Sequence, residues 1–98
     1  MITSKQRSFL KALAHDLDPT VFLGKQDLTT NIINEIDTCL EHRELVKVKL
    51  QDGCALSPKE VANQVAEQLG AEFVQAIGKK FTLYRESKDY KQIMLPKK

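Results

Sequence analysis

The stretch Leu45-Val46-Lys47-Val48-Lys49-Leu50 decides the fold, because apolar and basic residues alternate along it from Val46 onward. Successive side chains of a β-strand point to opposite faces of a sheet, so the alternation predicts a strand with one buried and one exposed face. Lys47 and Lys49 then project together from the exposed face. Helices and further strands are predicted on both sides of this strand.

Toward the N-terminus, the first element is predicted to be a helix from about Ser4 to His15. Thr3 and Gln6 have the spacing of a capping box, in which each side chain accepts a hydrogen bond from the other residue's backbone N–H. Helical spacing predicts a buried stripe made of Phe9, Leu10, Leu13 and Leu17. The other face carries Lys5, Arg7 and Lys11.

A short strand and a second helix are predicted next. The apolar run 20–23 follows Asp18-Pro19 and ends at Gly24, a pattern typical of a buried strand and a turn. A helix is predicted from about Thr29 to Glu41, because apolar residues recur there at helical spacing. These residues are Leu28, Ile32, Ile33, Ile36 and either Cys39 or Leu40. We expect Asn31, Asn34, Glu35 and Asp37 to face water.

Beyond a turn at Asp52-Gly53, the stretch Ser57-Pro58-Lys59-Glu60 predicts the start of a third helix. Ser57 would cap it, Pro58 would occupy its first turn, and Glu60 would complete a capping box. Its buried stripe is predicted to be Val61, Ala62, Val65, Ala66 and Leu69. Gly70 would end it. Two strands follow, over about 72–77 and 81–85, and 78–80 is short enough to connect them as a hairpin.

The predicted order is therefore α-β-α-β-α-β-β, an α/β fold. Helices between strands imply parallel crossovers, and the closing hairpin adds one antiparallel pairing. We expect a mixed four-stranded sheet packed with three helices. The length of 98 residues fits a single domain over 1–98, with 86–98 as a partly ordered, basic C-terminal tail.

Charge is unevenly distributed along the chain. The net charge of +2 divides into +2 over 1–25, −5 over 26–78 and +5 over 79–98. This segregation favours a polyanionic partner, although a basic tail can also serve solubility alone.

No local motif marks a catalytic set or a metal site, so we expect no enzyme activity and no cofactor. Cys39 and Cys54 are expected to be reduced thiols, and without a membrane span or signal peptide pattern the expected location is cytoplasmic.

Several short motifs give the chain a resemblance to the YhbY-like family, the bacterial stand-alone form of the CRM (chloroplast RNA splicing and ribosome maturation) domain. The motifs run over nearly the whole chain. They are Ser4-Lys5-Gln6-Arg7, Leu13-Ala14-His15, Gly24, Leu28-Thr29, Glu35-Ile36-Asp37, Glu44-Leu45-Val46-Lys47-Val48-Lys49, Gly70-Ala71, Gln75, Ile77-Gly78-Lys79, Leu83-Tyr84-Arg85 and Leu95-Pro96-Lys97-Lys98.

The resemblance implies an RNA-binding fold similar to the C-terminal domain of translation initiation factor three. It also implies association with rRNA of the precursor of the large ribosomal subunit, and so a function in ribosome assembly. The family is described as using a G-x-x-G-type loop, comparable to the backbone-clamping loop of KH domains. Here Gly78-Lys79-Lys80-Phe81 keeps the first glycine and has phenylalanine in place of the second.

The candidate RNA-binding residues are mainly basic, because lysine and arginine release counterions from phosphates. They are Lys25, Lys47, Lys49, Gly78, Lys79, Lys80, Arg85, Lys88 and Lys91, with Lys5, Arg7 and Lys11 as a possible extension. We expect the first group to form one contiguous edge, and the alternative is an ordinary solvated surface. For the three residues of the first helix, solvation and RNA contact are equally supported.

Other residues have two readings each. His15 and His42 could contact RNA or satisfy carbonyl groups at helix ends, the latter being favoured. Tyr84 could stack on a base or belong to the core.

Two alternative functions are also considered. The first is a module that docks a basic ribosomal protein through the acidic segment with Glu35, Asp37, Glu41 and Glu44, and the second is a small metal-independent nuclease or modifying enzyme. The expected partners are RNA and possibly ribosomal proteins, with no membrane, and a monomer is expected.

Overall fold

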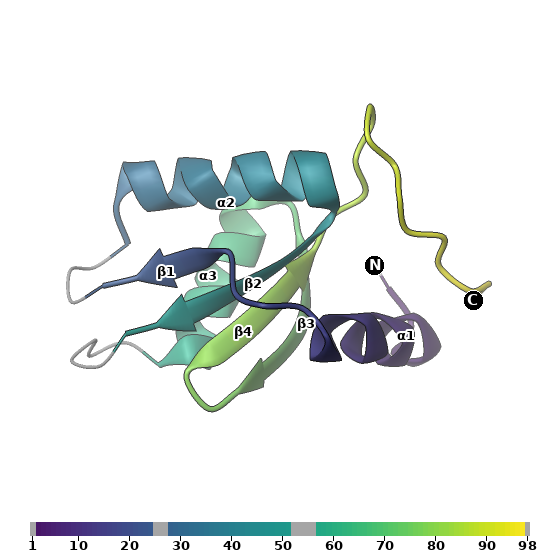
Figure 1. The fold of residues 1–98 in the computed structure, drawn as a ribbon, viewed down its shortest axis with the longest axis horizontal. Helices are drawn as coiled ribbons and strands as arrows, with labels where there is room; N and C mark the ends of the chain where they lie inside the picture. The colour runs from purple at the N-terminus through teal and green to yellow at the C-terminus, as the bar shows by residue number, and fades with distance from the viewer. Residues whose placement is uncertain (1, 25–27, 52–56, 98) are drawn as a thin grey trace.

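The computed structural model describes residues 2–24, 28–51 and 57–97, and it has the predicted order of elements (Figure 1). The elements are α1 (Ser4–His15), β1 (Val21–Leu23), α2 (Thr30–Arg43), β2 (Leu45–Leu50), α3 (Pro58–Leu69), β3 (Glu72–Ile77) and β4 (Lys80–Tyr84). Every predicted helix and strand is present, and the α/β class is confirmed. The turn predicted at Asp52-Gly53 and the residue Cys54 lie outside the described residues.

The sheet has the strand order β1-β2-β4-β3. Strands β1 and β2 pair in parallel, whereas β4 pairs antiparallel with both β2 and β3. The prediction of a single antiparallel pairing was therefore wrong. Strand β4 lies between β2 and β3, so these two strands run in the same direction without being neighbours. This position puts Phe81 and Leu83 of β4 in the middle of the sheet, where both side chains are almost fully buried.

Local capping explains where the helices begin and end. Both hydrogen bonds of the predicted capping box form at the start of α1, between Thr3 and Gln6. Gly70 ends α3 in the left-handed conformation, as predicted. Ser57 precedes α3 in an extended conformation but makes no side-chain capping bond, so the predicted second capping box is absent. Pro58 fixes the first turn of that helix instead.

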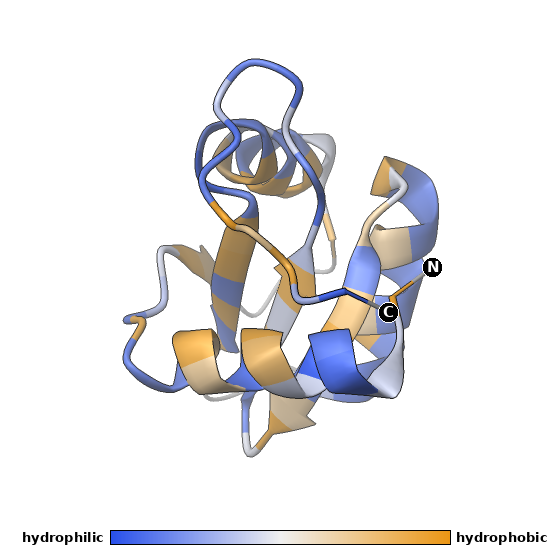
Figure 2. Cartoon of the chain, turned by 90° about the vertical axis from the view of Figure 1, so that its right-hand side faces the viewer, coloured by the Kyte–Doolittle hydropathy of each residue, from blue (hydrophilic) through white to orange (hydrophobic). Residues whose placement is uncertain are grey.

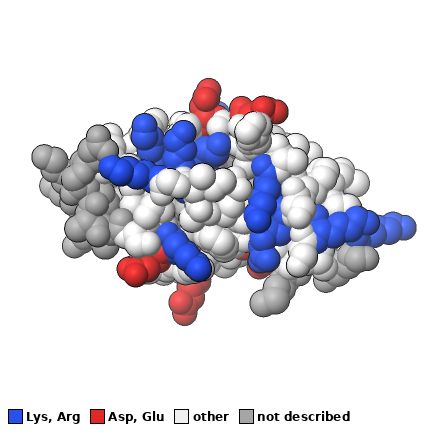
Figure 3. All heavy atoms as spheres, turned by 90° about the horizontal axis from the view of Figure 1, so that it is seen from below, with Lys and Arg blue, Asp and Glu red and all other residues white. Residues whose placement is uncertain are grey.

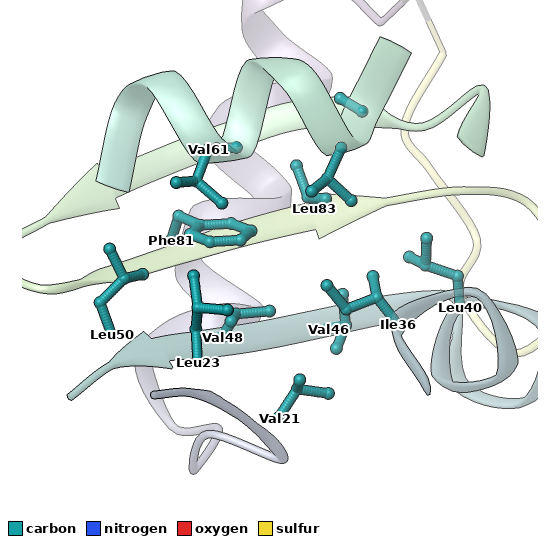
Figure 4. Packing of buried hydrophobic residues seen from close by; sticks show 13 residues of the cluster. Val21, Leu23, Ile36, Leu40, Val46, Val48, Leu50, Val61, Phe81 and Leu83 are labelled. Atoms are coloured by element: carbon teal, nitrogen blue, oxygen red, sulfur yellow. The ribbon is translucent and has the colours of Figure 1, made fainter. Parts of the chain in front are cut away.

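The larger apolar cluster lies between the sheet and helices α2 and α3 (Figure 4). The alternation of β2 was predicted correctly: Val46, Val48 and Leu50 point into this cluster. Helix α2 contributes Ile36 and Leu40, which are fully buried. Helix α3 contributes its predicted stripe, with Val61, Ala62 and Val65 at most 1% exposed.

Helix α1 packs on the opposite face of the sheet, over the end where β2 begins and β4 ends (Figure 2). Its buried residues are Gln6, Leu10 and Ala14, which form one face at a spacing of four. The predicted stripe was therefore wrong except for Leu10. Phe9, Leu13 and Leu17 are 38%, 40% and 37% exposed. The small side chain of Ala14 faces the sheet in their place.

The C-terminal segment 86–97 packs against this same end of the molecule. It is held by Glu44, which is fully buried and follows α2 in the left-handed conformation with φ 65°. The Glu44 carboxylate accepts hydrogen bonds from the backbone N–H groups of Ser87, Gln92 and Ile93, at 2.8, 2.5 and 2.8 Å. Further along, Gln6 Nε2 donates to the carbonyl of Pro96 at 3.0 Å. The chain thus ends beside the first turn of α1 (Figure 1).

Candidate nucleic-acid interface

Helix α1 covers only part of its face of the sheet. It packs where Leu45, Val74 and Tyr84 are buried. Farther along the strands no described helix covers the same face, and Phe22 and Ile77 are 49% and 67% exposed there. We call this uncovered part the open face.

Four side chains cross the open face in one row, which we call the open row. Strand register pairs Phe22 with Lys49, Lys49 with Lys80, and Lys80 with Ile77. Paired residues project from the same side of a sheet, so two exposed lysines stand side by side between two exposed apolar side chains. Like charges directly opposite each other repel. The pair is therefore unfavourable for the fold alone and favourable for binding an anion.

A pocket of about 390 Å³ adjoins the open row. Gln75 and Thr82 are paired in the next row of the sheet and line this pocket with an amide and a hydroxyl group. The other lining residues are His15, Lys47, Ile77, Gly78, Lys79 and Lys80. Three lysines and one histidine therefore surround a hollow that contains neutral polar groups. We call it the polar pocket.

Two hydrogen bonds to backbone carbonyls position the Lys47 side chain and the β3–β4 turn at the polar pocket. Lys47 Nζ donates to the carbonyl of Leu17 at 2.9 Å, which directs the lysine toward the loop after α1. The carbonyl of Lys79 accepts from the N–H of Leu50 at 2.7 Å, which ties the β3–β4 turn to the end of β2. Lysines from two separate chain segments, β2 and the β3–β4 hairpin, are held in one region in this way.

The β3–β4 turn is tighter than a KH-type loop. Gly78 and Lys79 alone connect the strands, and Gly78 has φ 59°, as the first central residue of a type II′ turn requires. Lys80 and Phe81 already belong to β4, and Phe81 is 1% exposed. Gly78-Lys79-Lys80-Phe81 is therefore not a backbone-clamping loop, because its last residue is needed in the core. What remains of the prediction is the pair of lysines beside the turn.

Basic residues of α1 reach the other side of edge strand β3. Arg7 and Lys11 line a second hollow of about 490 Å³ together with Lys59 of α3. Gln75 and Ile77 line both this hollow and the polar pocket. Arg7 Nε also donates to the carbonyl of Phe73 at 3.1 Å. Figure 3 shows groups of Lys and Arg side chains over this side of the molecule, with Asp and Glu mainly at its margins.

Four other predicted basic residues do not line the polar pocket: Arg85, Lys91, Lys88 and Lys5. Arg85 donates to Asp37 Oδ1 at 2.7 Å and to the carbonyl of Leu69 at 3.0 Å, and so joins α2 to the end of α3. Lys91 pairs with Glu86 at 2.8 Å in the C-terminal segment, which also contains Lys88. Lys5 lies in the first turn of α1, and His15 of the polar pocket lies at the other end of that helix. Lys25 lies outside the described residues.

Tyr84 is a core residue, so the structure supports the second of its two possible roles and not base stacking. It is 5% exposed and packs with Leu10 and Ala14 of α1. Burial, and then the negative charges of Glu44 and Glu86, raises the pKa of Tyr84 to about 12. His42 has the structural role that was favoured: its Nδ1 lies 2.9 Å from the carbonyl of Thr38, and its ring stacks on Tyr90.

Three of the four acidic residues proposed for docking a basic protein are engaged within the fold. Glu44 is buried, and Asp37 and Glu41 both pair with Arg85. Of the four acidic residues proposed for docking, Glu35 is the one that stays fully exposed. Among the described residues, no group of His, Cys, Asp and Glu could hold a metal ion, and no helix is long and apolar enough to cross a membrane.

Three residues of the open face and the polar pocket were not predicted as site residues from the sequence. Gln75 and Thr82 lie on strands whose register could not be read from sequence, and Phe22 was assigned to a buried strand. Its exposure follows from alternation with Val21 and Leu23, which are buried. This signal was present in the sequence, but three residues are too few to establish a period.

Comparison with known proteins shows which family the chain resembles. The family model for the CRS1 / YhbY (CRM) domain matches residues 2–85. The probable RNA-binding protein YqeI of Bacillus subtilis is 41% identical over 96 residues, covering 98% of this chain and all of that protein. An RNA-binding protein of Haemophilus influenzae is 40% identical over 97 residues, which cover 99% of this chain and 97% of that protein. The solution structure of SAV1595 from Staphylococcus aureus superposes with a TM-score of 0.82 at 43% identity, covering 98% and 100% of the two chains.

Proposed function

This chain belongs to the CRS1 / YhbY (CRM) domain family, and from that premise we propose that it binds RNA through the open face and the polar pocket. The proposed ligand is rRNA of the precursor of the large ribosomal subunit, and the proposed function is that of an assembly factor. The names of the relatives support RNA as the ligand. The family resemblance carried by the sequence motifs supports the ribosomal target.

One observation of the structure carries the proposal: lysines from β2, the β3–β4 turn and β4 meet at a single hollow. Lysines gathered in this way can each neutralise a phosphate and release its condensed counterion. Lys49 adds a further charge, because it lies opposite Lys80 in the register of β2 and β4. The surface therefore has the charge, and the polar groups between the charges, that a phosphodiester chain requires.

The test is the double variant Lys49→Glu with Lys80→Glu. The two residues are paired, so the variant keeps a like-charge pair at the same place, and little change in stability is expected. The matched control is Lys88→Glu with Lys97→Glu, which makes the same charge change at two exposed lysines of the C-terminal segment. Binding of an rRNA fragment is measured from low to physiological salt.

We expect the first variant to weaken binding at least about tenfold and to make it less salt-dependent, because each lost phosphate contact lowers the salt slope by about one unit. The control should bind within about threefold of the parent, because overall charge adds only a screened, long-range effect. Equal losses in both variants would contradict a localised interface. Sedimentation of the tagged protein with precursors of the large subunit, retained in the control and lost in the first variant, tests the ribosomal target.

A further inference from the structure

Nothing among the described residues explains the exposure of Phe22 and Ile77. Phe22 lies between Val21 and Leu23, which are at most 1% exposed, and its own ring points to the side that α1 leaves bare. Ile77 ends β3 on the same side of the sheet. Both large apolar side chains flank the lysines of the open row.

The geometry of the open row suits a short single strand. Four paired strands spaced by about 4.8 Å give a row roughly 14 Å long from Phe22 to Ile77. An aromatic ring on an open sheet face, next to lysines that reach phosphates, is the arrangement by which RRM sheets stack two or three unpaired bases. Aromatic stacking is independent of base identity, because every base has a π-face.

The polar pocket adds a second reason to favour unpaired nucleotides. Partly exposed Gln75 lines the pocket and supplies an amide group, whereas Thr82 beside it is 1% exposed and forms part of the pocket floor. The bases of an A-form duplex are paired and stacked, and the groove that exposes their edges is wide and shallow. An unpaired base can leave the stack and enter a hollow of about 390 Å³.

We propose that the open face takes single-stranded rather than duplex RNA, with one base stacked on Phe22. This inference rests on the proposed RNA binding and adds the class of RNA. It predicts that the aromatic ring of Phe22 contributes to affinity for unpaired RNA and contributes little to affinity for duplex RNA.

The absence of tryptophan from the chain gives a direct test. Phe22→Trp places a single reporter at the proposed stacking site, and Tyr90→Trp places one at a side chain with the same exposure, 49%, in the C-terminal segment. The probes are a mixed-sequence 12-nucleotide RNA without self-complementarity and the 12-base-pair duplex of that sequence. We expect the single strand to quench emission from Phe22→Trp strongly, and we expect neither probe to quench Tyr90→Trp.

Affinity provides the second readout. Stacking on an aromatic ring predicts that Phe22→Ala weakens binding of the 12-nucleotide single strand by about 5- to 150-fold and changes duplex binding less than about twofold. Circular dichroism confirms that the variant is folded. If Phe22→Ala binds the single strand like the parent while Lys49→Glu with Lys80→Glu does not, the stacking inference fails and the proposed RNA binding stands. If the lysine variant binds both probes like the parent, the proposed RNA binding itself fails.

Discussion

Replacement of Glu44 by glutamine should destabilise the protein far more than the same replacement at an exposed position near a helix end. Glu44 Oε1 accepts from Gln92 and Ile93, and Oε2 accepts from Ser87. A glutamine oxygen at the first position would keep two of these bonds. Its amide group would then face the N–H of Ser87, so one charge-assisted bond is lost, at a cost of about 1.5–3 kcal/mol. We expect Glu44→Gln to lower the free energy of unfolding by about 2 kcal/mol at pH 7.

The pH dependence of that difference is the sharper part of the prediction. Burial alone would raise the pKa of Glu44, but the backbone hydrogen bonds from Gln92, Ser87 and Ile93, together with the charge of Lys91, lower it below 4.5. A carboxyl group whose folded pKa is lowered stabilises the fold above its unfolded pKa. This contribution is lost as the pH falls from about 4.5 through the folded value. The two proteins should therefore approach equal stability in acid.

Urea unfolding followed by far-ultraviolet circular dichroism, at pH 7 and at steps down to pH 3, measures the difference. Glu35→Gln in the exposed part of α2 is the matched control and should change stability by less than about 0.5 kcal/mol. Equal stability of Glu44→Gln and the parent at pH 7 would refute the reasoning. So would a difference that stays constant down to pH 3.

Two further predictions concern side chains whose roles the structure changed. Arg85→Ala should lower the free energy of unfolding by about 2 kcal/mol in thermal or urea unfolding, because it leaves Asp37 and the carbonyl of Leu69 without their donor, and it should leave RNA affinity within about twofold. A tenfold loss of RNA affinity in Arg85→Ala would contradict this and show that Arg85 contributes to RNA binding. Leu10→Ala should cost about 2–5 kcal/mol in the same unfolding assay, whereas Leu13→Ala, at a side chain 40% exposed, should cost less than about 1 kcal/mol. Equal costs would contradict the packing of α1.

The elements were predictable because their signals are local. Alternation along β2, the capping box of Thr3 and Gln6, and Gly70 at the end of α3 each specify a structure within a few residues. The position of β4 was not predictable in this way. Strand β4 pairs with β2 on one edge and with β3 on the other, and in this central position Phe81 and Leu83 are buried. The pairing with β2 depends on contacts between segments far apart in sequence.

The candidate site was predictable in composition and only partly in geometry. Lys47, Lys79 and Lys80 do meet around one pocket, as alternation and the hairpin suggested. Arg85 could not be separated from them by sequence, because nothing local shows that Asp37, on a different helix, lies within reach. The prediction of the buried face of α1 was wrong for a related reason. Helical spacing is compatible with burial of either of two adjacent faces, and packing against the sheet selects the face with Ala14.

The contact between Gln6 and Pro96 joins residues 90 positions apart. Bringing these two groups together closes a loop of almost the entire chain, which costs conformational entropy. The contacts that offset this cost form only after α1 and the C-terminal segment can both pack on the finished sheet. We therefore expect the two ends to be the last region to assemble and the first to open. Amide hydrogen exchange should show this as weaker protection in α1 and at 92–97 than in β2 and β4.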